Sequence, residues 1–146
     1  MRVRPAAEVR FYVDADILGL AHVLAGLRAD VTYPGDQGAT IKRKTRAACP
    51  VQSPAAKDPE WIPVVAARGW LILTRDGKIQ AHPGELAAVR ENVARMVALD
   101  TEQARGTFEQ LEIVMCRWRQ IMDLIDQPGP FIYVASRTKL RRVPLD

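Results

Sequence analysis

The run WLILT at residues 70–74 restricts the fold more than any other part of the sequence. It is continuously apolar, whereas a strand with one face in water alternates apolar and polar residues, so it is typical of a strand covered on both faces. A helical pattern precedes it, opening on Asp58-Pro59 and ending before Gly69, and residues 85–91 predict a helix after it. Such strands alternating with helices indicate a parallel α/β sheet.

The same alternation extends over the rest of the chain. Short β-forming runs predict further strands, and apolar residues three and four positions apart predict further helices. The expected strands are 11–13, 31–33, 94–99 and 131–136, with a short basic strand within 137–145, and the expected helices are about 16–29 and 102–126. We therefore predict an α/β three-layer sandwich with a central, mostly parallel sheet. Because 146 residues are close to the common size of one domain, we expect residues 1–146 to form a single domain.

Residues 34–57 interrupt this alternation. Gly, Pro, Ala and Ser are frequent there, no apolar period survives, and a basic cluster is formed by Lys42, Arg43, Lys44 and Arg46. We predict a long basic loop at about 34–57, and loops of this length inside compact domains are usually functional or mobile. Two interpretations stay open: a loop that faces a substrate, and a solvated connection.

The expected helix over 102–126 has a regular apolar stripe. Its members are Phe108, Leu111, Met115, Trp118, Met122 and Ile125, with Val114 and Ile121 widening the face. We expect this face to pack on the sheet, because helices of single domains usually bury such faces internally. The alternative is a seam between the subunits of a homodimer.

Charge and cysteine content limit the partners and the cellular compartment that we expect. The net charge of +4 and the pI near 9.4 are compatible with a polyanionic partner. Cys49 and Cys116 are too few for a disulfide scaffold, which favours a reducing compartment. The first ten residues lack the apolar core of a signal peptide, and no apolar stretch has the length of a membrane span. We expect a cytoplasmic protein with no membrane association.

Three aspartates lie at the ends of the predicted elements. Asp14 follows the run FYV, Asp58 opens the helix before WLILT, and Asp76 follows WLILT. Each has a structural explanation, because Asp14 and Asp58 can cap helices and Asp76-Gly77 is a common turn. However, the carboxyl ends of parallel strands share one edge of a sheet, so the three acids can also converge. Carboxylates that converge are typical ligands of Mg²⁺ or Mn²⁺, which support hydrolysis without a nucleophilic side chain.

The segments FYVDADILGL and DPEWIPVVAARGWLILTRD resemble the PIN-domain ribonucleases, and most closely the PIN-like branch related to VapC toxins. In that family an Asp ends the first strand, an Asp opens a later helix, and a Thr-x-Asp motif follows the next strand. The resemblance implies that Asp14, Asp58 and Asp76 are the catalytic, metal-binding acids and that Thr74 supports the last turn. Asp16 is an additional candidate ligand. Residues 31–57 lack the early glutamate of typical PIN domains, so either Asp16 or Asp36 replaces it or this branch has a reduced acidic site.

The resemblance also implies an activity. The expected reaction is hydrolysis of RNA phosphodiester bonds with Mg²⁺ or Mn²⁺, and the expected role is the toxin of a type II toxin–antitoxin module, neutralised by an antitoxin protein. Basic side chains support an RNA substrate independently, since Arg75 and Lys78 flank Asp76, and Arg43 and Lys44 lie in the basic loop.

Two other functions stay open at this point. Asp14-Ala15-Asp16 after an apolar strand also resembles the motif of haloacid-dehalogenase-like phosphatases, in which the first Asp is a nucleophile and the second a general acid. That motif is short and therefore weakly specific. The other alternative is a module that binds nucleic acid or a partner without catalysis, with the acids acting as caps.

Overall fold

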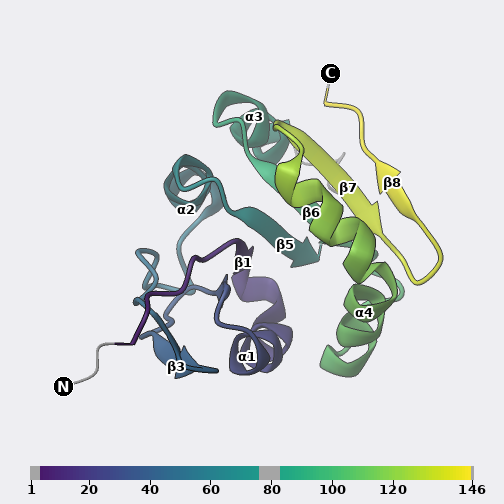
Figure 1. The fold of residues 1–146 in the computed structure, drawn as a ribbon. Coiled ribbons are helices and arrows are strands. Elements are labelled where there is room, and N and C mark those ends of the chain that lie inside the picture. Colours follow the sequence, from purple (N-terminus) through teal and green to yellow (C-terminus); the bar gives the residue numbers. More distant parts are fainter. Residues whose placement is uncertain (1–3, 76–82, 146) are drawn as a thin grey trace.

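The computed structural model describes residues 4–75 and 83–145. Within them, six strands form one sheet in the order β2-β1-β5-β6-β7-β8 (Figure 1). The first five run parallel, and β8 pairs antiparallel with β7. The bounds of the strands are β1 Phe11–Val13, β2 Val31–Thr32, β5 Leu71–Arg75, β6 Arg95–Leu99, β7 Phe131–Ala135 and β8 Leu140–Arg142. The expected mostly parallel sheet is confirmed.

Two layers of helices cover the sheet. Helices α1 (Leu18–Leu27) and α4 (Thr107–Asp123) pack on one face, and α2 (Asp58–Ala67) and α3 (Pro83–Glu91) pack on the other. Strand β5 contributes to both cores, because Leu71 and Leu73 join the first cluster and Ile72 joins the second, and all three are fully buried. A strand buried on both faces cannot alternate polar with apolar residues, which explains the run WLILT. The three-layer α/β sandwich is thereby confirmed.

The pairing of β1 with β5 places the candidate acids. Val13 lies opposite Leu73, and the backbone N–H of Asp14 continues the ladder by donating to the carbonyl of Leu73 at 2.9 Å. Asp14 therefore follows the carboxyl end of β1 directly beside Thr74. The chain then turns into the short 3₁₀ helix η1 (Ala15–Ile17) and enters α1.

A hairpin lies where the sequence predicts a long loop. Strands β3 (Ala39–Ile41) and β4 (Lys44–Arg46) pair antiparallel, and the turn between them places Lys42 and Arg43 at positive φ values of 49° and 71°. Turns of this kind usually contain Gly or Asn, so the sequence carried no hairpin signal. The expectation of an irregular loop over 34–57 is wrong for this part.

Helix α4 begins later than expected, at Thr107, and only part of its predicted apolar face is turned toward the core. Before it, Asp100 Oδ1 accepts hydrogen bonds from the backbone N–H groups of Glu102 and Gln103, which forms a turn instead of a helix. The stripe packs only in part: Val114 and Ile121 are buried, whereas Phe108 and Met115 are 77% and 65% exposed. The prediction that this whole face lies in the core is therefore wrong for Phe108 and Met115. In the described part of the chain, no helix combines the length and the apolar character needed to cross a membrane.

Candidate active site

Asp14 is fixed by the backbone around it. Its Oδ1 atom accepts a hydrogen bond of 2.7 Å from the N–H of Ala15, so the carboxylate caps η1. Its Oδ2 atom accepts a hydrogen bond of 3.1 Å from the hydroxyl of Thr74, which is 2% exposed. The Thr74 contact follows from the parallel pairing of β1 with β5, which places the carboxyl ends of the two strands side by side.

Asp16 approaches the same hydroxyl. Thr74 Oγ1 lies 3.3 and 3.2 Å from the two carboxylate oxygens of Asp16, and the backbone N–H of Arg75 donates to Asp16 Oδ2 at 3.1 Å. A hydroxyl has one proton, so Thr74 donates to one of the two carboxylates at a time. The end of β5 therefore holds two carboxylates, Asp14 and Asp16, against one hydroxyl group.

This arrangement disfavours the ionised form of Asp14 and raises the pKa of its carboxyl group. Burial is the main cause and the negative charge of Asp16 the second, and the pKa of Asp14 is raised from an ordinary value of 3.8 to about 7. The hydrogen bonds from Ala15 and Thr74 act in the opposite direction, and the charge of Asp58 adds a smaller increase. A cation beside Asp14 and Asp16 would remove the repulsion and restore the ionised form of Asp14.

Asp58 reaches this region from the other face of the sheet. The structure corrects its expected role as N-cap, because Lys57 occupies that position and Asp58 is the first residue of α2. Its Oδ1 atom accepts a hydrogen bond of 3.0 Å from Trp61 Nε1, and the Trp61 ring stacks on Tyr12 with the centroids 5.1 Å apart. The charges of Asp58 and Asp14 both raise the pKa of Tyr12, after burial as the main cause. Asp58 is thus directed toward the end of β1 by an aromatic pair.

Among the other residues of the prediction, Asp76 and Lys78 lie outside the described residues. Asp36 is 2% exposed and accepts hydrogen bonds from Arg46 Nε at 2.7 Å and from the Thr32 hydroxyl at 2.8 Å. Because this buried ion pair occupies its carboxylate, the expectation that Asp36 substitutes for the missing glutamate is wrong, and Asp16 is the acid that lies beside Asp14.

The predicted basic contacts fall into two regions. Arg75 is at the end of β5, and its Nη1 atom donates to the carbonyls of Ala104 and Arg105 at 3.1 and 3.3 Å, which ties this edge to the segment before α4. Lys44 and Arg43 belong to the β3–β4 hairpin, and Lys44 lines a pocket at the amino ends of β1 and β2. Arg10, which lines this pocket, precedes Asp14 by four positions along the extended chain, or about 13 Å. Arg43 and Lys44 are therefore not part of the acidic site.

Sequence reasoning missed two contributors to this edge. Asp100 follows β6 as Asp14 follows β1, and its carboxylate is occupied by backbone N–H groups of the next turn. Its position directly after the run ARMVAL was the signal that could have identified it. Trp61 is the other contributor, and no sequence pattern indicates that its indole N–H holds Asp58.

The donors suit a small divalent cation. Within residues 4–75 and 83–145, no three Asp, Glu, His or Cys side chains are grouped closely enough to hold a metal ion. Mg²⁺ is nevertheless commonly bound by one or two carboxylates with water and substrate phosphate completing the shell. Asp14 and Asp16 provide two carboxylates beside one hydroxyl, and Asp16 is exposed to solvent. These residues fit Mg²⁺ or Mn²⁺.

Comparison with known protein families finds a match for most of the chain. A family model described as a PIN like domain matches residues 9–101, which include Asp14, Asp16, Asp58, Thr74 and Asp76. No curated protein and no solved structure matches the chain. PIN-like domains are generally nucleases that use divalent metal ions. With the matched segment covering more than half of its length, this chain belongs to the PIN-like domain family.

Proposed function

We propose that this protein is an endoribonuclease that hydrolyses RNA phosphodiester bonds with Mg²⁺ or Mn²⁺, and that it acts as the toxin of a type II toxin–antitoxin module. The observation that carries the hydrolytic activity is the approach of two carboxylates, Asp14 and Asp16, to one buried hydroxyl at the carboxyl edge of a parallel sheet. Clefts beyond the carboxyl ends of strands are the usual ligand sites of such sheets.

The residues of the site have separable roles in this proposal. A bound Mg²⁺ or Mn²⁺ supplies charge neutralisation at the phosphate and a more acidic water molecule. Asp14 and Asp16 hold the ion, and the exposed position of Asp16 leaves room for RNA and water. Thr74 and the N–H of Arg75 fix the orientation of the two carboxylates. Asp58, held by Trp61, adds negative charge near Asp14, and Asp76 completes the proposed acidic set.

The phosphatase alternative requires an ionised Asp14 as nucleophile. The raised pKa of Asp14 does not separate the two reactions, because a bound cation would ionise this carboxyl group in either case. Membership of the PIN-like family favours a nuclease. A phosphoryl group on Asp14, detected by its lability to hydroxylamine, would support the phosphatase instead.

The test of the hydrolytic function is RNA cleavage by purified protein stripped with EDTA and then supplied with Mg²⁺ or Mn²⁺. We expect cleavage that requires the metal and falls at least 100-fold, as order of magnitude, in Asp14→Asn. Asp123→Asn is the matched control, because it removes the same charge from an exposed position on α4. Metal-dependent RNA cleavage at equal rates by Asp14→Asn and Asp123→Asn would contradict the proposal. Retained RNA binding without cleavage by the parent would instead identify a binding module.

The toxin role and the antitoxin partner rest on the resemblance to VapC-related proteins. We expect expression of the parent chain to arrest growth of a bacterial host and expression of Asp14→Asn not to do so. Co-expression of the protein encoded next to this gene should restore growth by forming a complex with the parent. If the parent cleaves RNA but its expression does not affect growth, the proposed nuclease activity stands and the toxin role is disproved.

A further inference from the structure

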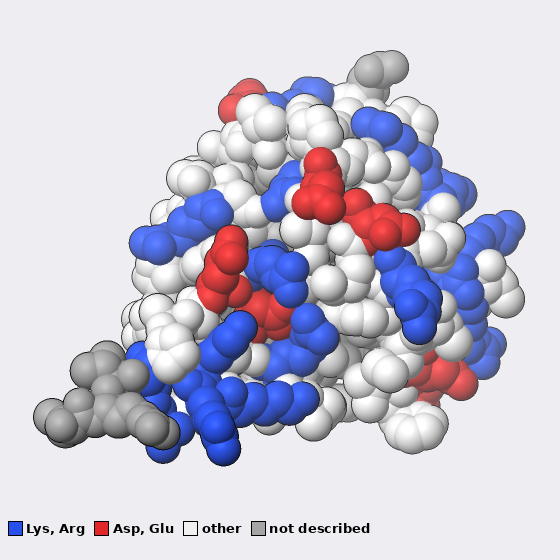
Figure 2. Space-filling view, in the orientation of Figure 1, with Lys and Arg blue, Asp and Glu red and all other residues white. Residues whose placement is uncertain are grey.

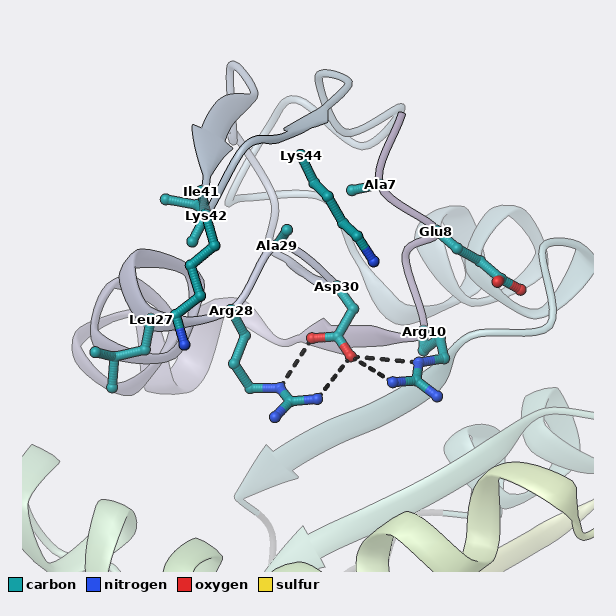
Figure 3. A pocket seen from close by; sticks show the side chains of 10 residues that line it. All are labelled: Ala7, Glu8, Arg10, Leu27, Arg28, Ala29, Asp30, Ile41, Lys42 and Lys44. Carbon is teal, nitrogen blue, oxygen red and sulfur yellow. Dashed lines mark hydrogen bonds and ion pairs between the residues drawn. The ribbon is translucent and has the colours of Figure 1, made fainter. Parts of the chain in front are cut away.

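A charged pocket lies at the edge of the sheet opposite the acids. It has a volume of about 460 Å³ and is lined by residues that precede β1 and β2, by the end of α1, and by the β3–β4 hairpin. Its charged members are Arg10, Arg28, Lys42 and Lys44 against Asp30 and Glu8, so cations outnumber acids (Figure 3). Figure 2 shows Lys and Arg side chains gathered on this face over α1 and β3.

Asp30 holds the two arginines in place. Arg28 donates from Nε and Nη2 to the two carboxylate oxygens at 2.9 Å each, and Arg10 donates to Oδ2 from Nη2 at 3.0 Å and from Nε at 3.3 Å. These contacts lower the pKa of Asp30 against the effect of its burial, with Arg28 contributing more than Arg10. The Arg28 guanidinium also lies 4.8 Å from the centroid of Trp118. Within the described residues, Nη1 of each arginine makes no hydrogen bond, which leaves oriented donors.

The hairpin presents two lysines over this arrangement. Figure 3 shows the ammonium group of Lys44 directed toward Asp30 and that of Lys42 beside Leu27, at the end of α1. The hairpin is firmly attached, because the buried Arg46–Asp36 ion pair lies at its base and Arg46 Nη1 donates to carbonyls near the end of α1.

The chemistry of the lining selects the ligand. Oriented guanidinium donors and lysine ammonium groups bind phosphate oxygens. The residues that line the pocket include no aromatic side chain on which a base could stack, so the contact is with the backbone and not with a base. We infer that this pocket binds backbone phosphates of the RNA, a second contact about 13 Å from the acids that fixes the strand on the protein. This inference rests on the RNA substrate of the proposed function.

The test measures RNA binding without cleavage. A fluorescein-labelled single-stranded RNA of mixed sequence is titrated with Asp14→Asn protein in EDTA, and fluorescence anisotropy gives Kd at several salt concentrations. We expect Lys42→Ala/Lys44→Ala to weaken binding about tenfold and to reduce the slope of log K against log salt by about 1.4, or about 0.7 per lost phosphate contact. The control is Arg119→Ala/Lys139→Ala, which removes two exposed positive charges elsewhere and should leave Kd within about twofold.

Equal Kd values and salt slopes for the two double variants would overturn the inference. Competition by AMP at micromolar concentration, lost in Lys42→Ala/Lys44→Ala, would also overturn it, because the pocket would then hold a free nucleotide. The binding measurement is independent of catalysis. A parent that binds through the pocket but never cleaves RNA disproves only the ribonuclease, whereas a parent that cleaves RNA while the pocket variants bind normally disproves only the pocket.

Discussion

The carboxyl group of Asp14 binds a proton more tightly in the folded protein than in the unfolded chain, because burial and Asp16 raise its pKa from 3.8 to about 7. For a group whose pKa is raised on folding, the stability it contributes is fully present below the unfolded pKa and is lost as the pH rises through the folded pKa. Metal-free protein should therefore become less stable between about pH 4 and pH 7 because of this residue.

Asp14→Asn tests that dependence. The amide has no charge to bury, so the metal-free variant should gain stability relative to the parent as the pH rises, on the order of 2 kcal/mol at pH 8 compared with pH 4.5. Urea unfolding in EDTA at the two pH values measures the difference, with Asp123→Asn as control. An equal difference between variant and parent at both pH values would show that Asp14 has an ordinary pKa.

Thr74 gives the second prediction for single residues. Thr74→Val removes the hydroxyl that holds Asp14 and Asp16 while keeping the shape of a buried side chain, and Thr74→Ser keeps the hydroxyl. Outer contacts of metal ligands are worth about 10–100-fold, so we expect kcat/KM for RNA to fall by that factor in Thr74→Val and by only a few-fold in Thr74→Ser. Comparable losses in both variants would assign Thr74 to packing instead of ligand orientation.

The residues of the site were predictable to different degrees. Asp14 and Thr74 could be placed from the sequence, because they lie at the carboxyl ends of two apolar runs that predict parallel strands. Asp58 could not, because its role depends on the dihedral angles of the cap residue before it, Lys57. Asp36 could not, because its partner Arg46 lies ten positions away on the far side of a hairpin.

At the scale of elements, helix α4 carries apolar side chains both in the core and in contact with solvent. Ile113 is fully buried against the sheet, whereas Phe108 on the same helix is 77% exposed. In the isolated chain Ile113→Ala should lower the free energy of unfolding by about 2–5 kcal/mol. Phe108→Ala should change it by less than about 0.5 kcal/mol.

Urea unfolding at two protein concentrations measures both effects on α4. A large loss of unfolding free energy in Phe108→Ala, together with unfolding of the parent that depends on protein concentration, would contradict the exposure of this side of α4 to solvent. That result would favour the homodimer seam.

The elements show where sequence patterns suffice. WLILT was recognised as a buried strand because its composition reflects contacts on both faces of the sheet. The β3–β4 hairpin was missed because its turn, Lys42-Arg43, contains no turn-forming residue and its stability comes from the distant Arg46–Asp36 pair. The start of α4 was misjudged because the Asp100 side chain competes for the N–H groups of Glu102 and Gln103.

At the scale of the molecule, the sheet separates two kinds of chemistry. Acids lie at the carboxyl ends of its strands, and the pocket with two arginines and two lysines lies at the amino ends of β1 and β2. The net charge of +4 is thus distributed unevenly, with acidic groups where a cation is expected and basic groups where phosphates are expected. This division is the whole-molecule feature that the proposed RNA hydrolysis requires.

The location of a bound metal ion tests the central claim most directly. Crystals of the protein soaked in Mn²⁺ can be measured for anomalous scattering, which identifies the ion itself. The account predicts an anomalous peak within ligand distance of the carboxylates of Asp14 and Asp16, and its loss in Asp14→Asn. Full occupancy elsewhere on the molecule with no peak beside Asp14 would contradict it.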